Sequence, residues 1–234
     1  MAIPSAPSLL QQVTWPVTRV YDFATMHPMR ELKRRALQSS ADYIEQHMPD
    51  AVAFGSRRGY LHYVAGLVAD TSGVVCELGV WKGESLRLLA RELAPERHLH
   101  GFDSFEGLPE AWAGPDSAAS IFDVKGRLPD VPTNVSLHPG WFEDSLPRWK
   151  KEHDDPIALL HIDCDLYSST RTGLDELHER LQPGSLVLFD EYFNYPGWRQ
   201  HEYRAFQEHV AERGIEYRYV AYARNQVAVR LEVC

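Results

Sequence analysis

The acidic residues best placed for chemistry follow two short apolar runs in the second half of the chain. Asp163 and Asp165 come after the run IALLHI, and the pair Asp190 and Glu191 comes after SLVLF. If the two runs are neighbouring parallel strands, their ends bring these carboxylates to one edge of a sheet. Carboxylates crowded into one cleft repel one another unless a cation neutralises them, and Mg²⁺ prefers oxygen ligands. The spacing therefore predicts a Mg²⁺ site formed by Asp163, Asp190 and Glu191.

The same acids also have a less specific interpretation. Each could cap a helix or pair with an arginine such as Arg171 or Arg199. For Asp165 we give helix capping at least equal weight, because a helix is expected to begin directly after it. His161 lies inside an apolar run, and we interpret it as a packed strand residue rather than a ligand.

A glycine-containing segment overlaps the end of another apolar run, VVCEL, at residues 74–78. It begins at Glu77 and has the pattern E-x-G-x-x-x-G, with Gly79 and Gly83 as its glycines and Ser85 as a possible helix cap. Because the pattern is not GxGxxG, the tight turn that binds the pyrophosphate of a dinucleotide is absent. We therefore expect these four residues to bind a nucleoside without phosphates, S-adenosylmethionine. An ordinary strand-to-helix turn is the alternative.

Two further segments complete the predicted cofactor site. Asp103 and Ser104 follow the run HLHGF, and Asp103 lies roughly 20 residues beyond the glycines, where an acid can accept the ribose hydroxyls. A lone Asp after a strand could also be a turn residue. After the run NVSLH, Trp141 and Phe142 could flank an adenine ring or simply pack against the next helix.

The elements that must position these residues alternate along the chain. Apolar runs typical of buried strands lie at 74–78, 98–102, 134–138, 157–162 and 185–189. Helical patterns lie at 85–93, 172–181 and 200–213, and two final runs on either side of Arg224 and Asn225 predict a hairpin. This alternation predicts an α/β fold with a Rossmann-like, mostly parallel sheet of seven strands.

Residues 1–70 are predicted to form a helical N-terminal extension to a core domain at residues 71–234. Apolar residues at helical spacing predict one helix within residues 29–48. A second is expected over residues 56–70, with Ser56 as its N-cap. We expect the extension to form a lid or a dimer contact, and a homodimer is the commonest oligomer.

The composition narrows the choice of partner and compartment. A net charge of −9 disfavours a nucleic acid partner. No apolar run reaches the roughly 20 residues that span a bilayer, and the N-terminus lacks the basic start of a secretory signal. Three cysteines without a CxxC pair indicate a reducing compartment. We therefore expect a cytoplasmic protein that acts on a small molecule.

Five segments together resemble the macrocin O-methyltransferase family, over roughly residues 74–230. They are CELGVWKGES, GFDSFEGLPE, GWFEDSLP, HIDCDLYSST and PGSLVLFDEYFNYPGW. The resemblance implies a class I, Mg²⁺-dependent methyltransferase acting on hydroxyls of antibiotic sugars and related natural products. It also implies metal ligands at Asp163, Asp190 and Glu191. The family's second pair is usually Asp-Asp, so Glu191 is a departure that leaves the geometry of the metal open.

The predicted activity is therefore an S-adenosylmethionine-dependent, Mg²⁺-dependent O-methylation, with Asp163 as the general base. Four aromatic residues after the fifth strand could line the acceptor pocket or pack the loop: Tyr192, Phe193, Tyr195 and Trp198. Three alternatives stay open at this point. They are an N- or C-methyltransferase of the same fold, a non-catalytic protein that binds cofactor and metal, and an NAD-dependent enzyme, which the missing GxGxxG disfavours.

Overall fold

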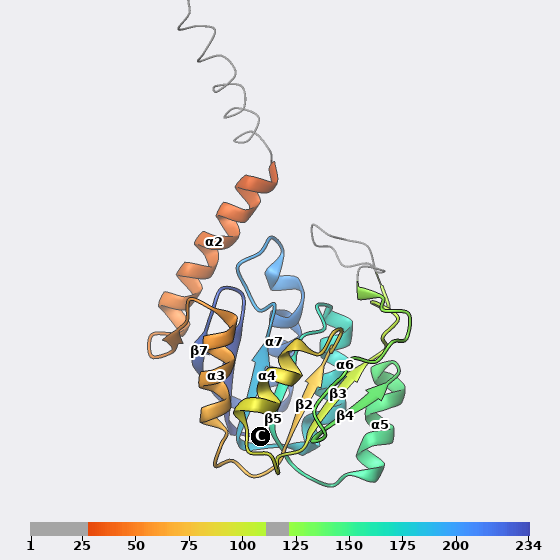
Figure 1. The fold of residues 1–234 in the computed structure, drawn as a ribbon. Coiled ribbons are helices and arrows are strands. Elements are labelled where there is room, and N and C mark those ends of the chain that lie inside the picture. The colour runs from red at the N-terminus through yellow and green to blue at the C-terminus, as the bar shows by residue number, and fades with distance from the viewer. Residues whose placement is uncertain (1–27, 111–121) are drawn as a thin grey trace, which may run out of the picture.

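The structure, a computed structural model, describes residues 28–110 and 122–234, which are organised around one sheet (Figure 1). Its eight strands join in the order β1-β7-β8-β6-β5-β2-β3-β4. The strands are β1 (Val52–Ala53), β2 (Val74–Leu78), β3 (Leu99–Asp103), β4 (Val135–Pro139), β5 (Ile157–Ile162), β6 (Leu181–Phe189), β7 (Glu216–Tyr222) and β8 (Val227–Val233). From β6 to β4 the strands run parallel, and β8 is antiparallel to β6 and β7.

The predicted α/β class, the mostly parallel sheet and the final hairpin are confirmed. Every residue of β2 and β5 is buried, and apart from Glu77 and His161 these central strands are apolar throughout. Two features differ from the prediction. The short edge strand β1 pairs with β7 and adds an eighth strand. Strand β6 begins at Leu181 rather than at the predicted Ser185. The prediction missed its first residues because Pro183 and Gly184 are typical of a turn.

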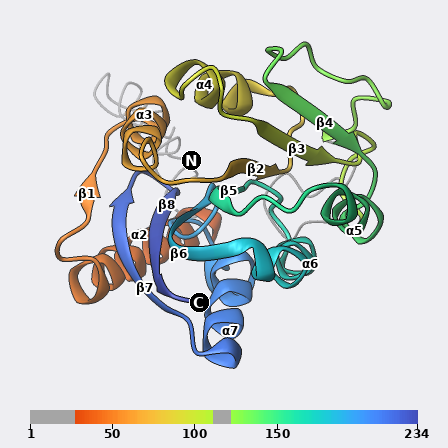
Figure 2. The same ribbon diagram turned by 90° about the horizontal axis from the view of Figure 1, so that it is seen from below.

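Helices cover both faces of the sheet, as the view in Figure 2 shows. The helices are α2 (Pro28–His47), α3 (Arg57–Leu67), α4 (Glu84–Glu92), α5 (Phe142–Glu152), α6 (Tyr167–Leu177) and α7 (Glu202–Arg213), with 3₁₀ turns η2 (His178–Arg180) and η3 (Trp198–Gln200). Helices α3 and α4 pack on one face through residues such as Leu61 and Leu86. Helices α2, α5, α6 and α7 pack on the other, through residues such as Tyr43, Trp149 and Phe206.

Helix α6 begins at Tyr167, close to the start expected after Asp165 and before residue 172, where the apolar helical pattern begins. Its first turn, after Tyr167, consists of Ser168, Ser169 and Thr170, which give no apolar signal although Ser169 and Thr170 are buried. The helix then tightens into η2 before β6 begins. The helix boundaries here depend on packing that the hydrophobic pattern does not record.

The N-terminal helices lie where the sequence predicts them. Helix α3 starts after Ser56, whose Oγ accepts a hydrogen bond from the Gly59 amide at 3.2 Å, so the predicted N-cap is confirmed. Residues 1–27 of the predicted extension lie outside the described residues. The division at residue 70 and the lid or dimer role stay predictions. No helix within residues 28–110 and 122–234 is long and apolar enough to cross a membrane.

Candidate functional site

A cavity of about 360 Å³ opens at the carboxyl ends of strands β2 to β6. Its walls include the residues that directly follow each of these strands, as expected for a parallel α/β sheet. Most of the predicted site residues line it: Gly79, Ser85, Asp103, Ser104, Trp141, Phe142, Asp163, Asp190 and Glu191. Glu77 and Gly83 are not among the lining residues.

Gly79 allows the loop after β2 to pass against the end of β5. Its φ is +89°, and a Cβ at this position would lie 1.8 Å from the carbonyl oxygen of Asp163. Gly83, with φ +70°, is the N-cap residue of α4. Ser85 therefore lies inside the first turn rather than at the cap, and its Oγ donates a hydrogen bond to Glu77 at 2.9 Å.

Asp103 fixes the shape of this loop. Its Oδ2 accepts hydrogen bonds from the amides of Val80 and Trp81, both at 2.7 Å, and its Oδ1 accepts one from Phe105 at 2.7 Å. An ionised carboxylate offers about four lone-pair sites, so a ribose hydroxyl would have to share this group with the backbone. Ser104 donates to the carbonyl of Gly107 at 3.0 Å. Ribose binding by Asp103 stays a prediction.

Four aromatic side chains line the cavity: Trp81, Phe122, Trp141 and Phe142. Trp141 and Phe142 lie at the start of α5, where the sequence places them. Trp81 was not predicted as a site residue. It sits between the two glycines with a left-handed φ of 47°, remains exposed, and lies edge-on to Phe122 at 5.7 Å between ring centroids. Its place inside the glycine segment was the signal that could have found it.

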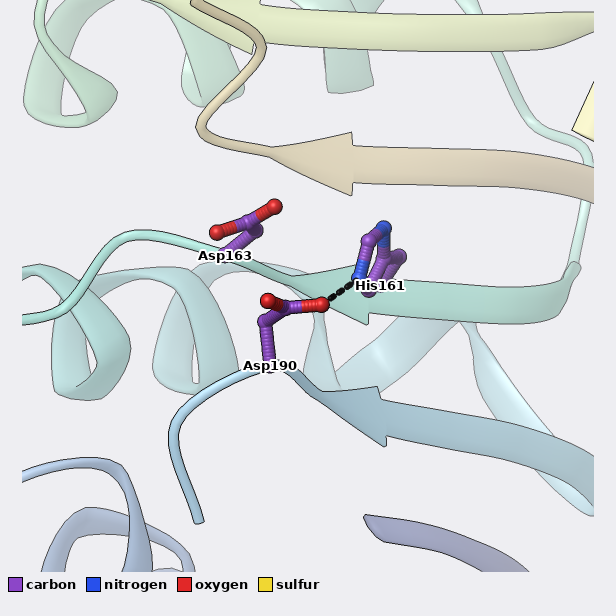
Figure 3. A group of neighbouring side chains, drawn as sticks. All are labelled: His161, Asp163 and Asp190. Atoms are coloured by element: carbon purple, nitrogen blue, oxygen red, sulfur yellow. Dashed lines mark ion pairs between the residues drawn. The ribbon is translucent and has the colours of Figure 1, made fainter. Parts of the chain in front are cut away.

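The acidic cluster lies at the ends of β5 and β6 (Figure 3). Potential ligand atoms of His161, Asp163 and Asp190 all lie within 4.8 Å of one another. Nδ1 of His161 is hydrogen-bonded to Glu77 at 2.8 Å, and its Nε2 lies 3.6 Å from Asp190, an ion-pair distance longer than a hydrogen bond. His161 therefore belongs to the cluster as well as to the core. Glu77 orients His161, and its predicted contact with the cofactor stays a prediction.

The ionisable groups in this cluster shift one another's pKa values. Burial disfavours a charged imidazole, but Asp190 and Glu77 outweigh it and raise the pKa of His161 to about 10. Burial likewise opposes ionisation of Asp190, yet His161 and Arg57 lower its pKa to about 2. For Asp163, burial and the charge of Asp190 raise the pKa well above its ordinary range.

Arg57, the first residue of α3, already bridges two of the predicted metal ligands. Its Nη2 donates to Asp163 at 2.8 Å and its Nε donates to Asp190 at 2.7 Å. The arginines considered from the sequence lie elsewhere. Arg171 pairs with acidic side chains of α6 and α7, and Arg199 stacks on Trp198.

The donor set nevertheless fits a divalent cation. Glu191 lines the cavity, although it is not in the group of three. Its Oε2 and the Oε1 of Glu202 are buried and have no hydrogen-bond partner among the described residues. Burial and the neighbouring acids raise the pKa of both groups well above the usual range. The cluster therefore contains more carboxyl groups than Arg57 and His161 can pair with, and hard cations prefer such oxygen ligands.

Asp165 lines the cavity and is not the N-cap residue of α6. The N-cap of α6 is Leu166, whereas Asp165 is buried, lines the cavity and has a left-handed φ of 61°. Burial and the charge of Asp190 raise the pKa of Asp165 to about 7. A carboxyl group with such a pKa can exchange a proton near neutrality.

The aromatic residues after β6 pack the protein rather than line this cavity. Tyr192, Phe193 and Trp198 are buried, and Trp198 donates a hydrogen bond to Ser39 of α2 at 3.1 Å. Tyr195 is half-buried and donates to the carbonyl of Glu191 at 3.0 Å. Of the two interpretations given for these residues, the buried three support packing.

The strand order and the position of the cavity define a Rossmann-like, class I methyltransferase fold. A crystal structure of CalS11, a calicheamicin methyltransferase, is similar, with a TM-score of 0.64, 22% identity and coverage of 98% of this chain and 99% of that chain. The structure of the O-methyltransferase NovP is also similar, with a TM-score of 0.58, 22% identity and coverage of 76% and 80%. At these identities the likeness establishes the fold.

The family follows from the sequence match. Residues 61–218 match the family model described as macrocin-O-methyltransferase (TylF), and the chain belongs to this family. A tetracenomycin-C rhamnosyl 4'-O-methyltransferase of Streptomyces olivaceus is 33% identical over 156 residues, which is 55% of this chain and 57% of that protein. Mycinamicin III 3''-O-methyltransferase of Micromonospora griseorubida is 31% identical over 173 residues, 61% of this chain and 65% of that protein. The chain thus spans about three-fifths of these relatives.

Proposed function

We propose that the protein transfers the methyl group of S-adenosylmethionine to a hydroxyl oxygen of a small-molecule natural product, such as a sugar. One observation carries this proposal: Gly79 and the carboxylates of Asp163 and Asp190 line the same cavity. A nucleoside pocket beside acidic groups suits a reaction in which an acceptor hydroxyl loses a proton. Membership of an O-methyltransferase family supports the same reaction.

In the proposed reaction the acceptor oxygen attacks the methyl carbon, the new C–O bond forms and the bond to the sulfonium sulfur breaks. The loop after β2 and the aromatic residues Trp81 and Trp141 orient the cofactor. A carboxylate of the cluster takes the acceptor proton, with Asp163 as the first choice and Asp165 as the alternative. Mg²⁺, which Asp163, Asp190 and Glu191 would hold, lowers the pKa of the acceptor hydroxyl when bound.

Cofactor binding can be tested by isothermal titration with S-adenosylhomocysteine and, separately, with NAD⁺. We expect S-adenosylhomocysteine to bind and NAD⁺ not to bind, because the loop lacks the pyrophosphate-binding turn. The reverse result would contradict the proposal.

Methyl transfer can then be followed by mass spectrometry with a panel of glycosylated acceptors. We expect a product methylated at oxygen, which a chelator abolishes and added Mg²⁺ restores. A product methylated at nitrogen or carbon would support the alternative chemistry. Cofactor binding without any product across the panel would favour the non-catalytic alternative.

A further inference from the structure

Arg57 stands apart from the other residues of the acidic cluster because it reaches the cluster from the N-terminal side of the fold. It begins α3, whereas Asp163 and Asp190 follow β5 and β6. Its guanidinium uses two different nitrogens, Nη2 for Asp163 Oδ2 at 2.8 Å and Nε for Asp190 Oδ1 at 2.7 Å. One side chain therefore ties helix α3 to the ends of two strands.

The two oxygens that Arg57 holds belong to the carboxylates that would bind a divalent cation. Ligand oxygens of Mg²⁺ lie about 2.0–2.1 Å from the ion. A guanidinium nitrogen within hydrogen-bond distance of the same oxygens would then lie only a few ångströms from the metal. The repulsion between the two cations at such a separation is strong in a partly buried site. This repulsion disfavours simultaneous binding of the metal and Arg57 to these two carboxylates, so the two cations compete for them.

We infer that Arg57 is a built-in competitor of the divalent cation, which the metal displaces from Asp163 and Asp190 when it binds. This inference rests on the proposed function, because it assumes that the cluster binds metal. It makes Arg57 the residue that sets the metal affinity of the site. It also links metal binding to the N-terminus of α3, because the displaced side chain no longer holds that helix end against β5 and β6.

The acidic excess described above explains why both states are stable. With the metal absent, Arg57 supplies the positive charge that Asp163 and Asp190 require. With the metal present, the carboxylates are neutralised without Arg57, and its side chain, about one-third exposed, can extend into the solvent. The apparent association constant for metal is then the intrinsic constant multiplied by the fraction of molecules in which Arg57 does not contact Asp163 and Asp190.

The test is a titration of the whole 234-residue chain with Mn²⁺ alone. Calorimetry measures the affinity, and the Mn²⁺-induced shift in melting temperature is measured separately. Arg57→Gln should bind Mn²⁺ about tenfold or more tightly than the wild type, because the competing charge is gone. Its melting temperature without metal should be lower, and Mn²⁺ should raise it by more than in the wild type. Arg57→Lys, which keeps one charge but loses the fork, should fall between the two.

Arg58 provides a matched control, because it is exposed and lies beside Arg57 in the same turn. Arg58→Gln makes the same change in net charge and should leave the Mn²⁺ affinity within about twofold of the wild type, since exposed charges are screened. Equal or weaker binding by Arg57→Gln, with Asp163→Asn abolishing binding, would overturn this inference and leave the metal site standing. Failure of every variant and of the wild type to bind Mn²⁺ would overturn both the inference and the metal part of the proposed function.

Discussion

Asp103 and Asp163 flank the same loop after β2, but their carboxylates bond to different groups. Asp103 accepts hydrogen bonds from the backbone of the loop at Val80 and Trp81, whereas Asp163 pairs with Arg57. The first carboxylate shapes the cofactor side of the cavity and the second belongs to its acidic side. Substitution of each should therefore affect a different step.

Asp103→Asn should weaken the binding of S-adenosylhomocysteine by about tenfold or more, because both carboxylate oxygens accept hydrogen bonds from backbone amides and the amide nitrogen of Asn cannot accept one. Asp163→Asn should leave that affinity within about threefold and lower kcat by about a hundredfold or more, because the proton acceptor is lost. Calorimetry and initial rates at saturating acceptor measure the two effects. Equal effects of the two substitutions on both quantities would mean that the roles are wrongly assigned.

At the residue scale, the sequence predicts the site residues that directly follow strands. It does not predict the residues from distant parts of the chain that contact them. Asp163 and Asp190 could be placed together because strand ends in a parallel sheet share an edge. Arg57 could not, because nothing in the sequence fixes how the start of α3 meets β5 and β6. His161 was hidden because a histidine in a buried strand looks like a packing residue until its partners Glu77 and Asp190 are known.

At the scale of elements, the loop from β2 to α4 depends on contact with the end of β5. A side chain at Gly79 would collide with the backbone of Asp163, so the loop and the strand end fit together only when that position has no Cβ. Gly184, in β6, has a similar φ of +95° but open space around its Cα. A substitution at Gly184 therefore introduces backbone strain alone, whereas one at Gly79 introduces backbone strain and a steric clash.

Gly79→Ala should lower the free energy of unfolding by about 3 kcal/mol or more, since it adds overpacking to backbone strain. Gly184→Ala should cost only about 1 kcal/mol, the contribution of the left-handed backbone alone. Urea denaturation of both variants against the wild type measures the difference. Similar losses for the two would show that the contact with Asp163 relaxes at little cost.

Elements with a strong local pattern were predicted well, and elements defined by their neighbours were not. Strands β2 and β5 are buried on both faces, so their sequences alone identify them. The strand β1 has only two residues and both are exposed, so its pairing with β7 leaves no pattern to read. The start of α6 is polar, and its burial comes from the tertiary packing.

For the whole molecule, two buried histidines have pKa values below the ordinary range. On the face covered by α5, α6 and α7, burial and the neighbouring His138 and His153 lower the pKa of His100 to about 3. Burial lowers the pKa of His209 to about 4, although Asp175 opposes this. Both rings are therefore neutral in the folded protein at pH values where the unfolded chain, with a histidine pKa of about 6.5, takes up protons.

At these two histidines the unfolded state binds more protons, so their contribution to the free energy of unfolding should fall as the pH drops below about 6.5, by up to about 1.4 kcal/mol per pH unit for each histidine. Carboxyl groups whose pKa is raised in the folded protein, such as Asp165, act in the opposite direction. His100→Leu should make this fall shallower. Urea midpoints at pH 7 and pH 5 measure it. Leu137→Ala, which removes no titrating group, should lower the stability equally at both pH values. An unchanged pH dependence in His100→Leu would argue against a neutral, buried ring.

The position of Arg57 has a practical consequence for dissecting this protein. The segment that matches the family begins at residue 61, downstream of both α2 and the first turn of α3. A protein trimmed at its N-terminal end to residue 61 would lose the guanidinium that pairs with Asp163 and Asp190, together with the Tyr43 hydroxyl that lies 2.6 Å from Tyr219. Its acidic cluster would have one positive charge fewer, and Tyr219 would lose a hydrogen-bond partner. The metal affinity measured on such a fragment would therefore differ from that of the intact chain.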